Sequence, residues 1–159
     1  MQIIRNRRIV DDDWIHVADD APVPADGKVF VSLERWQSER DALTARDGAL
    51  GVVLPNTVDP RDLESDLSHF AAIAVDFPVY RDGRGFSIAR LLRERLKYPG
   101  EIRAVGNVLR DQILFMERCG FDAYEVQEGK SLESVLAGFD DFSVTYQDAA
   151  VPRTVPRTR

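Results

Sequence analysis

Two hydrophobic periods alternate along most of the chain. Short apolar runs rich in strand-forming residues are followed by segments whose apolar positions recur every three or four residues. The apolar runs predict strands at 28–33, 49–55, 71–78, 101–106, 121–126 and 142–147. The segments between them predict helices at 34–48, 59–70, 86–97, 109–119 and 131–139. Asp59 and Pro60 are expected to begin one helix, and Gly48 and Gly120 are expected to end two others.

This alternation predicts an α/β fold of successive βα units with a mostly parallel sheet and right-handed crossovers. The pattern leaves an open sheet and a partial barrel as alternatives. A complete eight-unit barrel needs about 250 residues, and the chain has 159. Residues 1–27 are interpreted as a small N-terminal β element, a hairpin or an edge strand with a linker, 28–148 as one α/β domain, and 149–159 as a disordered or partner-dependent tail.

The composition is typical of a globular protein of the cytoplasm. Hydrophobic residues make up 44% of the chain and charged residues 30%, and no apolar run approaches the roughly 18 residues of a membrane span. The N-terminus lacks the pattern of a signal peptide. A single cysteine, Cys119, excludes internal disulfides and fits a reducing compartment. The two histidines, His16 and His69, are far apart in the sequence, so no metal site is predicted.

Charge is distributed unevenly along the chain. The net charge of −6 argues against general nucleic-acid binding. Residues 81–110 nevertheless hold eight Arg or Lys against three acidic residues, a net of +5, which leaves −11 for the rest of the chain. This local excess of positive charge predicts one specific anionic ligand or an acidic partner surface.

The carboxyl ends of parallel strands are where ligands bind in α/β folds. Polar residues follow several of the predicted strands, and their side chains are expected to meet on one rim. Four of these residues are general rim candidates: Asn56, Asp76, Gln112 and Glu125. Asp76 is a candidate base or ligand-binding residue there. A structural ion pair between Asp76 and a nearby arginine is an equal alternative.

The segment "DGRGFS", residues 82–87, predicts an anion site at the start of a helix. Gly83 and Gly85 allow positive φ angles and a close approach of the backbone, and the helix start offers free N–H groups. The Ser87 hydroxyl is suited to cap the helix or to donate a hydrogen bond to the anion. The Arg84 guanidinium is suited to bind the anion through two parallel hydrogen bonds. The full predicted set of anion-binding residues is Arg81, Arg84, Gly85, Ser87, Asn107 and Arg110. A plain tight turn at Asp82-Gly83 is the alternative.

The helix that follows has an apolar stripe and a basic row. Ile88, Leu91, Leu92 and Leu96 are expected to face the sheet. Arg90, Arg93 and Lys97 form a separate row, interpreted as a solvated face or a surface for a partner. Asn107 is expected to cap the next helix, and Cys119 to be a packed thiol.

Three consecutive motifs carry a family resemblance. They are "GRGFSIARLLRER" (83–95), "GEIRAVGNVLRDQ" (100–112) and "MERCGFDAYE" (116–125). In order and spacing they resemble the bacterial domain of unknown function family 934. Members of that family are commonly encoded beside assimilatory sulfite reductase, and many have the general label oxidoreductase. The resemblance implies a cytoplasmic role in sulfate or sulfite reduction and supplies no catalytic residues.

Two functions are compatible with these observations. One is an accessory protein that docks on sulfite reductase or on another acidic redox partner, with an anion-binding rim. The other is a small-molecule oxidoreductase or anion-binding enzyme that acts on sulfite or on a phosphate-bearing ligand. The chain has neither a cysteine cluster for iron–sulfur nor a dinucleotide fingerprint. The cofactor therefore stays unknown, and a flavin bound at the strand ends is one alternative. A homodimer formed through an N-terminal edge strand is a separate alternative for the oligomeric state.

Overall fold

The computed structural model describes residues 1–78 and 83–141, and its centre is one sheet of eight strands. The strands lie in the order β2-β1-β8-β7-β6-β5-β4-β3. Strands β3 to β8 are parallel neighbours, whereas β1 is antiparallel to both β2 and β8. The predicted α/β fold with a mostly parallel sheet is confirmed. The bounds are β1 Gln2–Arg5, β2 Arg8–Asp11, β3 Trp14–His16, β4 Lys28–Ser32, β5 Leu50–Leu54, β6 Ala72–Phe77, β7 Glu101–Gly106 and β8 Ala123–Tyr124.

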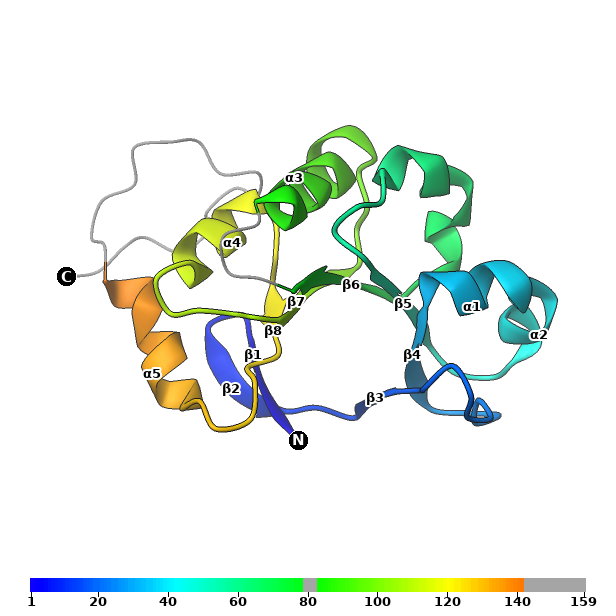
Figure 1. Ribbon diagram of the computed structural model, residues 1–159, viewed down its shortest axis with the longest axis horizontal. Coiled ribbons are helices and arrows are strands. Elements are labelled where there is room, and N and C mark those ends of the chain that lie inside the picture. The colour runs from blue at the N-terminus through cyan, green and yellow to red at the C-terminus, as the bar shows by residue number, and fades with distance from the viewer. Residues whose placement is uncertain (79–82, 142–159) are drawn as a thin grey trace.

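The sheet curls strongly, so that its strands follow a ring in Figure 1. The two edge strands, β2 and β3, are consecutive in the sequence and are joined by Asp12 and Asp13 alone. Of the two predicted alternatives, the structure is therefore a half-barrel rather than an open sheet. The N-terminal segment belongs to the same sheet, because β1 pairs with β8 and β3 pairs with β4.

The helices cover the outer, convex face of the curled sheet (Figure 1). Between them and the sheet lies the main apolar core, which includes Trp36, Ile73, Val75, Leu92 and Phe121. These side chains alternate along the strands with those of the inner face, as the two-residue period of a strand requires. The bounds are α1 Leu33–Ser38, α2 Arg40–Ala45, η1 Pro60–His69, α3 Arg84–Arg90, η2 Leu91–Arg95, α4 Ile113–Cys119, α5 Leu132–Leu136 and η3 Ala137–Asp140.

A smaller apolar cluster lies on the inner, concave face of the sheet. It consists of Phe30, Ala72, Ala74 and Val105, with Trp14 and Val53 packed against it. The middle strands carry very small residues here because the Phe30 ring lies over them. A Cβ atom on Gly51 would come within 2.6 Å of that ring, so this position accepts no larger side chain without a shift of the ring.

Several predicted helix boundaries are confirmed. Asp59 accepts a hydrogen bond from Arg61 N at the start of η1, and Pro60 is its first residue. Gly120 is the C-cap of α4 and has a positive φ angle. The predicted end at Gly48 is wrong, because α2 ends at Ala45 with Arg46 as its C-cap; Gly48 has a positive φ angle in the turn that follows, close to the backbone of Gly27. The predicted helix 34–48 is interrupted at Glu39, whose φ of −122° is not helical, and becomes α1 and α2.

Other predicted elements differ in length or in type. The predicted strand 121–126 is shorter in the structure, where only Ala123 and Tyr124 form β8. Just before β8, the Asp122 carboxylate accepts the N–H of Ile102 on the neighbouring strand. The helix predicted at 86–97 begins at Arg84 and continues as the π-helical turn η2. The predicted strand 142–147 and the tail 149–159 lie outside the described residues.

Candidate functional site

The inner face of the half-barrel carries a group of charged side chains, which extends from the carboxyl ends of the parallel strands toward their amino ends. We use "the mouth" for the concave side of the sheet at the carboxyl ends of β3 to β8. We use "the inner network" for a set of five charged residues on this side: Arg5, Asp12, Glu101, Arg103 and Glu125. Carboxyl ends of parallel strands are the usual place for a ligand in folds of this class.

Arg103 is the centre of the inner network and is completely buried. Its Nη1 atom donates to Asp12 Oδ2 at 2.8 Å and to Glu125 Oε2 at 2.9 Å, and its Nε donates to Glu101 Oε2 at 2.9 Å. The guanidinium carbon lies 5.0 Å from the centre of the Phe30 ring. Burial alone favours the neutral form, but the hydrogen bonds and charges of the three carboxylates outweigh it and raise the pKa of Arg103.

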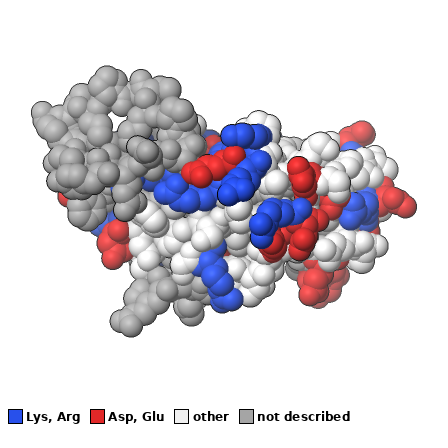
Figure 2. Space-filling view, turned by 90° about the horizontal axis from the view of Figure 1, so that it is seen from above, with Lys and Arg blue, Asp and Glu red and all other residues white. Residues whose placement is uncertain are grey.

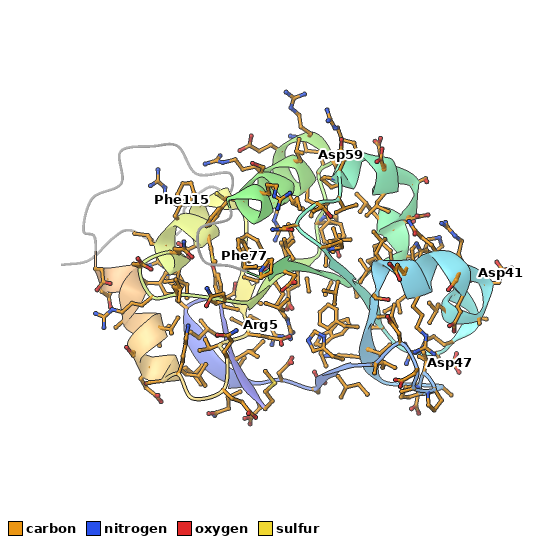
Figure 3. All side chains as sticks on the ribbon, in the orientation of Figure 1. Arg5, Asp41, Asp47, Asp59, Phe77 and Phe115 are labelled. Atoms are coloured by element: carbon orange, nitrogen blue, oxygen red, sulfur yellow. The ribbon has the colours of Figure 1, made fainter. Side chains whose placement is uncertain are left out.

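Arg5 extends this network from the antiparallel side of the sheet. Its Nε donates to Glu101 Oε1 at 2.9 Å, and its Nη2 lies 3.5 Å from Asp12 Oδ1. Figure 3 shows Arg5 on the inside of the ring. The Asp12 side chain is only 2% exposed. Burial alone raises the pKa of Asp12, but its hydrogen bond to Arg103 and the two arginine charges lower it overall.

His16 joins the network at the mouth. Its Nε2 lies 2.7 Å from Glu125 Oε2, and its ring stacks on Phe30 with the ring centres 5.0 Å apart. The His16 side chain is 43% exposed and the Glu125 side chain 12%. Burial raises the pKa of Glu125, but the His16 and Arg103 contacts outweigh it and lower that pKa overall. A chain of hydrogen bonds therefore leads from solvent at His16 to the buried Arg103.

Asp76 is a second titratable group of the inner face, near the end of β6. Side chains two residues apart in a strand point to the same face, and Asp76 follows the inward residues Ala72 and Ala74 at this spacing. Its side chain therefore lies on the concave side. It is half-buried, and burial raises the pKa of its carboxyl group. Within residues 1–78 and 83–141 no hydrogen bond or ion pair is seen for it. Gly106 passes close by, since a Cβ there would lie 2.7 Å from Asp76 Oδ1.

The predicted anion-binding loop has a different geometry from the one expected. Gly83 has a φ of −89° and Gly85 lies in α3, so the expectation of positive φ angles is wrong. Gly85 is required for packing instead, because a Cβ there would lie 2.6 Å from the Phe77 ring. Figure 3 shows Phe77 between the sheet and the helices. Ser87 is exposed and does not cap the helix.

The other predicted anion residues lie at several places around the strand ends. Arg84 is exposed in the first turn of α3. Arg110 makes two hydrogen bonds to the Asp141 carboxylate, at 3.0 and 2.9 Å. Asn107 follows Gly106 and does not cap α4, which begins at Ile113 after Gln112, and its Oδ1 lies 3.4 Å from Lys130 Nζ. Arg81 lies outside the described residues.

Of the general rim candidates, Asn56, Asp76 and Glu125 each follow or end a different parallel strand. Asn56 is buried, at 8% exposure, and Glu125 is part of the inner network. His16, Asp12 and Arg103 are not among the site residues that the sequence predicts. A signal existed for Arg103, because a charged residue in the middle of the apolar run "EIRAVG" is rarely buried without partners.

The basic row of the α3–η2 helix is not simply a solvated face. Arg93 points inward: it donates to the carbonyl oxygens of Tyr98, Gly100 and Gly120 at 2.7 to 2.9 Å, and its side chain is 13% exposed. This arginine holds the loop after η2 against the end of α4. It is therefore a structural residue rather than a contact for a partner.

In the described ranges the side chains that commonly bind metals do not cluster, and the cysteine is buried. No group of three His, Cys, Asp or Glu side chains there is placed to hold a metal ion. Cys119 is fully buried, and burial raises the pKa of its thiol, as expected for a packed side chain. None of the helices in these ranges is long and apolar enough to cross a bilayer.

Comparison with known proteins identifies the family. Residues 51–156 match the family described as "Bacterial protein of unknown function (DUF934)", which covers more than half of the chain. No protein of curated function and no solved structure matches the chain. The match includes β5 from its second residue, all of β6 to β8, and the three motifs that carry the resemblance. The chain therefore belongs to the bacterial DUF934 family.

Proposed function

We propose that this protein is a cytoplasmic accessory component of assimilatory sulfate or sulfite reduction, which docks on sulfite reductase or on its electron donor. The metabolic context comes from the resemblance of the three motifs to a family encoded beside sulfite reductase. The observation that carries the docking function is a basic surface on the α3–η2 helix. We use "the basic surface" for three cations of this helix, Arg84, Arg90 and Arg95, and for Lys97, which follows the end of η2 with a φ of 56°.

The basic surface contrasts with the acidic rest of the chain. Residues 83–97 hold five Arg or Lys and a single acid, Glu94, in a protein of net charge −6. Arg84, Arg95 and Lys97 are exposed, and Arg90 is half-exposed and pairs with Glu94 at 3.0 Å. Figure 2 shows basic side chains gathered around acidic ones over this helix. Such a surface attracts an acidic partner and speeds the encounter more than it strengthens a buried contact.

A binding experiment tests the docking function. Sulfite reductase from the same bacterium is titrated with the wild-type protein at low and at raised salt. We expect binding that weakens with salt, and that weakens about tenfold in the R95E/K97E variant, a loss of about 1.4 kcal/mol. The variant R8E changes an exposed arginine on β2 and is the matched control. Equal binding by both variants, or no binding by the wild type, would contradict docking through this helix.

Gene deletion tests the metabolic role separately. A deletion strain is expected to grow on sulfide or cysteine and to grow poorly on sulfate and on sulfite. Normal growth on sulfate, in a strain without a second copy of the gene, would remove the sulfur-assimilation assignment.

A second candidate function is a small-molecule enzyme or anion-binding protein that acts on sulfite or on a phosphate-bearing ligand. The exposure of Arg84 and Ser87 together in the first turn of α3 favours it. Calorimetry with sulfite, sulfate and phosphate, on the wild type and on R84A, tests this candidate. We expect measurable heat with the wild type and none with R84A. An absorption spectrum of the purified protein shows in addition whether a flavin is bound.

A further inference from the structure

We propose that the mouth is a proton-transfer site for a small uncharged or cationic molecule, in which His16 is the acid–base group and Glu125 positions it. This inference goes beyond the proposed role in sulfite reduction and does not depend on it. It rests on the contacts of His16 on the concave side of the sheet, whereas the basic surface lies on the outer helices.

The contact with Glu125 determines which nitrogen of His16 carries a proton. A carboxylate only accepts hydrogen bonds, so the Nε2 atom at 2.7 Å must be the donor. The neutral imidazole then has its lone pair on Nδ1. Within the described residues Nδ1 has no hydrogen-bond partner, and the imidazole is open to solvent, since the side chain is 43% exposed. This is the arrangement by which a carboxylate prepares a histidine for general-base catalysis.

The rest of the inner network holds this pair in place. Glu125 accepts from Arg103 Nη1 at 2.9 Å, and Arg103 is fixed by Asp12 and Glu101 without any exposure to solvent. The Phe30 ring stacks on His16 at an interplanar angle of 17° and sets the plane of the imidazole. A catalytic side chain needs this kind of second layer, because a misplaced base loses most of its effect. Stability alone does not explain the arrangement, since buried ion pairs stabilise a fold only weakly.

Asp76 gives the mouth a second group that exchanges protons. It lies on the same concave side at the end of β6, without a partner in the described part of the chain. Its half-buried carboxyl group holds a proton more readily than an exposed one. Two titratable groups in different environments are the usual requirement for separate acid and base functions.

The charges of the site determine the kind of molecule that it accepts. The inner network has two arginines and three carboxylates, and Asp76 adds a further carboxylate. With neutral His16 the formal sum is −2 when Asp76 is ionised and −1 when it is protonated, so in either state a dianion such as sulfate is repelled and an uncharged or cationic molecule is favoured. In the transfer step, Nδ1 takes a proton from an acidic O–H, N–H or C–H bond of the ligand. The bonding electron pair remains on the ligand, and the imidazolium is stabilised by Glu125.

A simple base-catalysed elimination tests this site without knowledge of the natural ligand. The probe is 5-nitrobenzisoxazole, an uncharged molecule whose ring C–H proton is removed by a base while its N–O bond breaks to give a coloured nitrophenolate. We expect the wild-type protein to react about tenfold faster than imidazole at the same concentration, a modest part of the range for positioned bases. H16Q is expected to lose this excess. H69Q, which removes the only other histidine, is expected to retain it.

Glu125 is tested by variants that separate positioning from folding. E125Q is expected to lower the rate about tenfold and to alter its pH profile, whereas E125D is expected to restore part of the rate. Wild-type rates no higher than those of free imidazole, or equal rates in H16Q and the wild type, would overturn the proposal. If H16Q loses only thermal stability, His16 merely fastens the sheet edge, which also overturns it. None of these outcomes depends on the growth phenotype of the deletion strain.

Discussion

Nε2 of His16 lies 2.7 Å from Oε2 of Glu125, although four strands separate β3 from β8 in the sheet. Only a strongly curled sheet brings these two strands together across its concave side. The contact therefore links one edge of the half-barrel to the far side, and it places a histidine at the mouth.

The energy of this contact is expected to be small but measurable. The His16 side chain is 43% exposed, so solvent screens the interaction. In a double-mutant cycle of H16Q and E125Q, monitored by urea denaturation, we predict a coupling free energy of about 0.5 kcal/mol. Strictly additive effects of the two substitutions would show that the pair does not form in solution.

Replacement of Arg103 is expected to be strongly destabilising. R103M leaves the three carboxylates of the network without their main donor, on a buried surface. Loss of one partner from a buried ion pair costs about 3–5 kcal/mol in the free energy of unfolding. R61A removes an arginine that pairs with Asp59 on the outside, and no measurable change in the urea midpoint is expected for it. Similar midpoints for the two variants would contradict the buried network.

Two glycines are expected to respond oppositely to alanine. G51A forces a Cβ to 2.6 Å from the Phe30 ring and 3.0 Å from the Ala72 carbonyl oxygen, which predicts a loss of about 1–3 kcal/mol in the free energy of unfolding. Gly83 has a φ of −89°, and no described atom lies within 4 Å of the position that a Cβ would take there, so G83A is expected to be neutral or slightly stabilising. Thermal unfolding of both variants checks this prediction. A destabilised G83A would contradict the geometry of the loop.

The pH dependence of stability is expected to include a component from Asp122. Burial raises the pKa of Asp122 to about 6, in spite of the nearby Arg93 charge. In the unfolded chain the carboxyl group loses its proton near pH 4, whereas in the folded protein it keeps it until about pH 6. The folded state thus loses stability as the pH rises through this interval, and D122N removes this loss.

Urea denaturation of the wild type and D122N between pH 4 and 8 provides the measurement. The stability of the wild type relative to D122N is expected to fall between about pH 4 and 6 and to stay constant above. Asp12 and Glu125 have lowered pKa values and lose their stabilising effect in acid, but they are common to both proteins and cancel in the comparison. Parallel pH curves would contradict the raised pKa of Asp122.

Local patterns in the sequence predict the order of the elements well. The alternation of the two hydrophobic periods predicts the parallel strands β4 to β7, and Asp59 and Gly120 mark helix ends that the structure confirms. Each of these signals depends on a few consecutive residues. Local propensity and backbone geometry therefore suffice for them.

The curl of the sheet and the inner network depend on residues that are distant in the sequence. His16 and Glu125 are 109 positions apart, and Arg103 and Asp12 are 91 apart. No periodicity in one chain indicates such pairs. The same limitation explains the error at Gly85, where the requirement for glycine comes from the ring of Phe77 rather than from a φ angle.

The ring N–H of His16 provides the most direct test of the inner network and the mouth. In a nitrogen-15 NMR spectrum at neutral pH, a hydrogen bond to Glu125 predicts a slowly exchanging proton on Nε2 of His16, present in H69Q and absent in E125A. Rapid exchange of every ring proton of both histidines, in the wild type as in E125A, would contradict a carboxylate-held imidazole at the mouth.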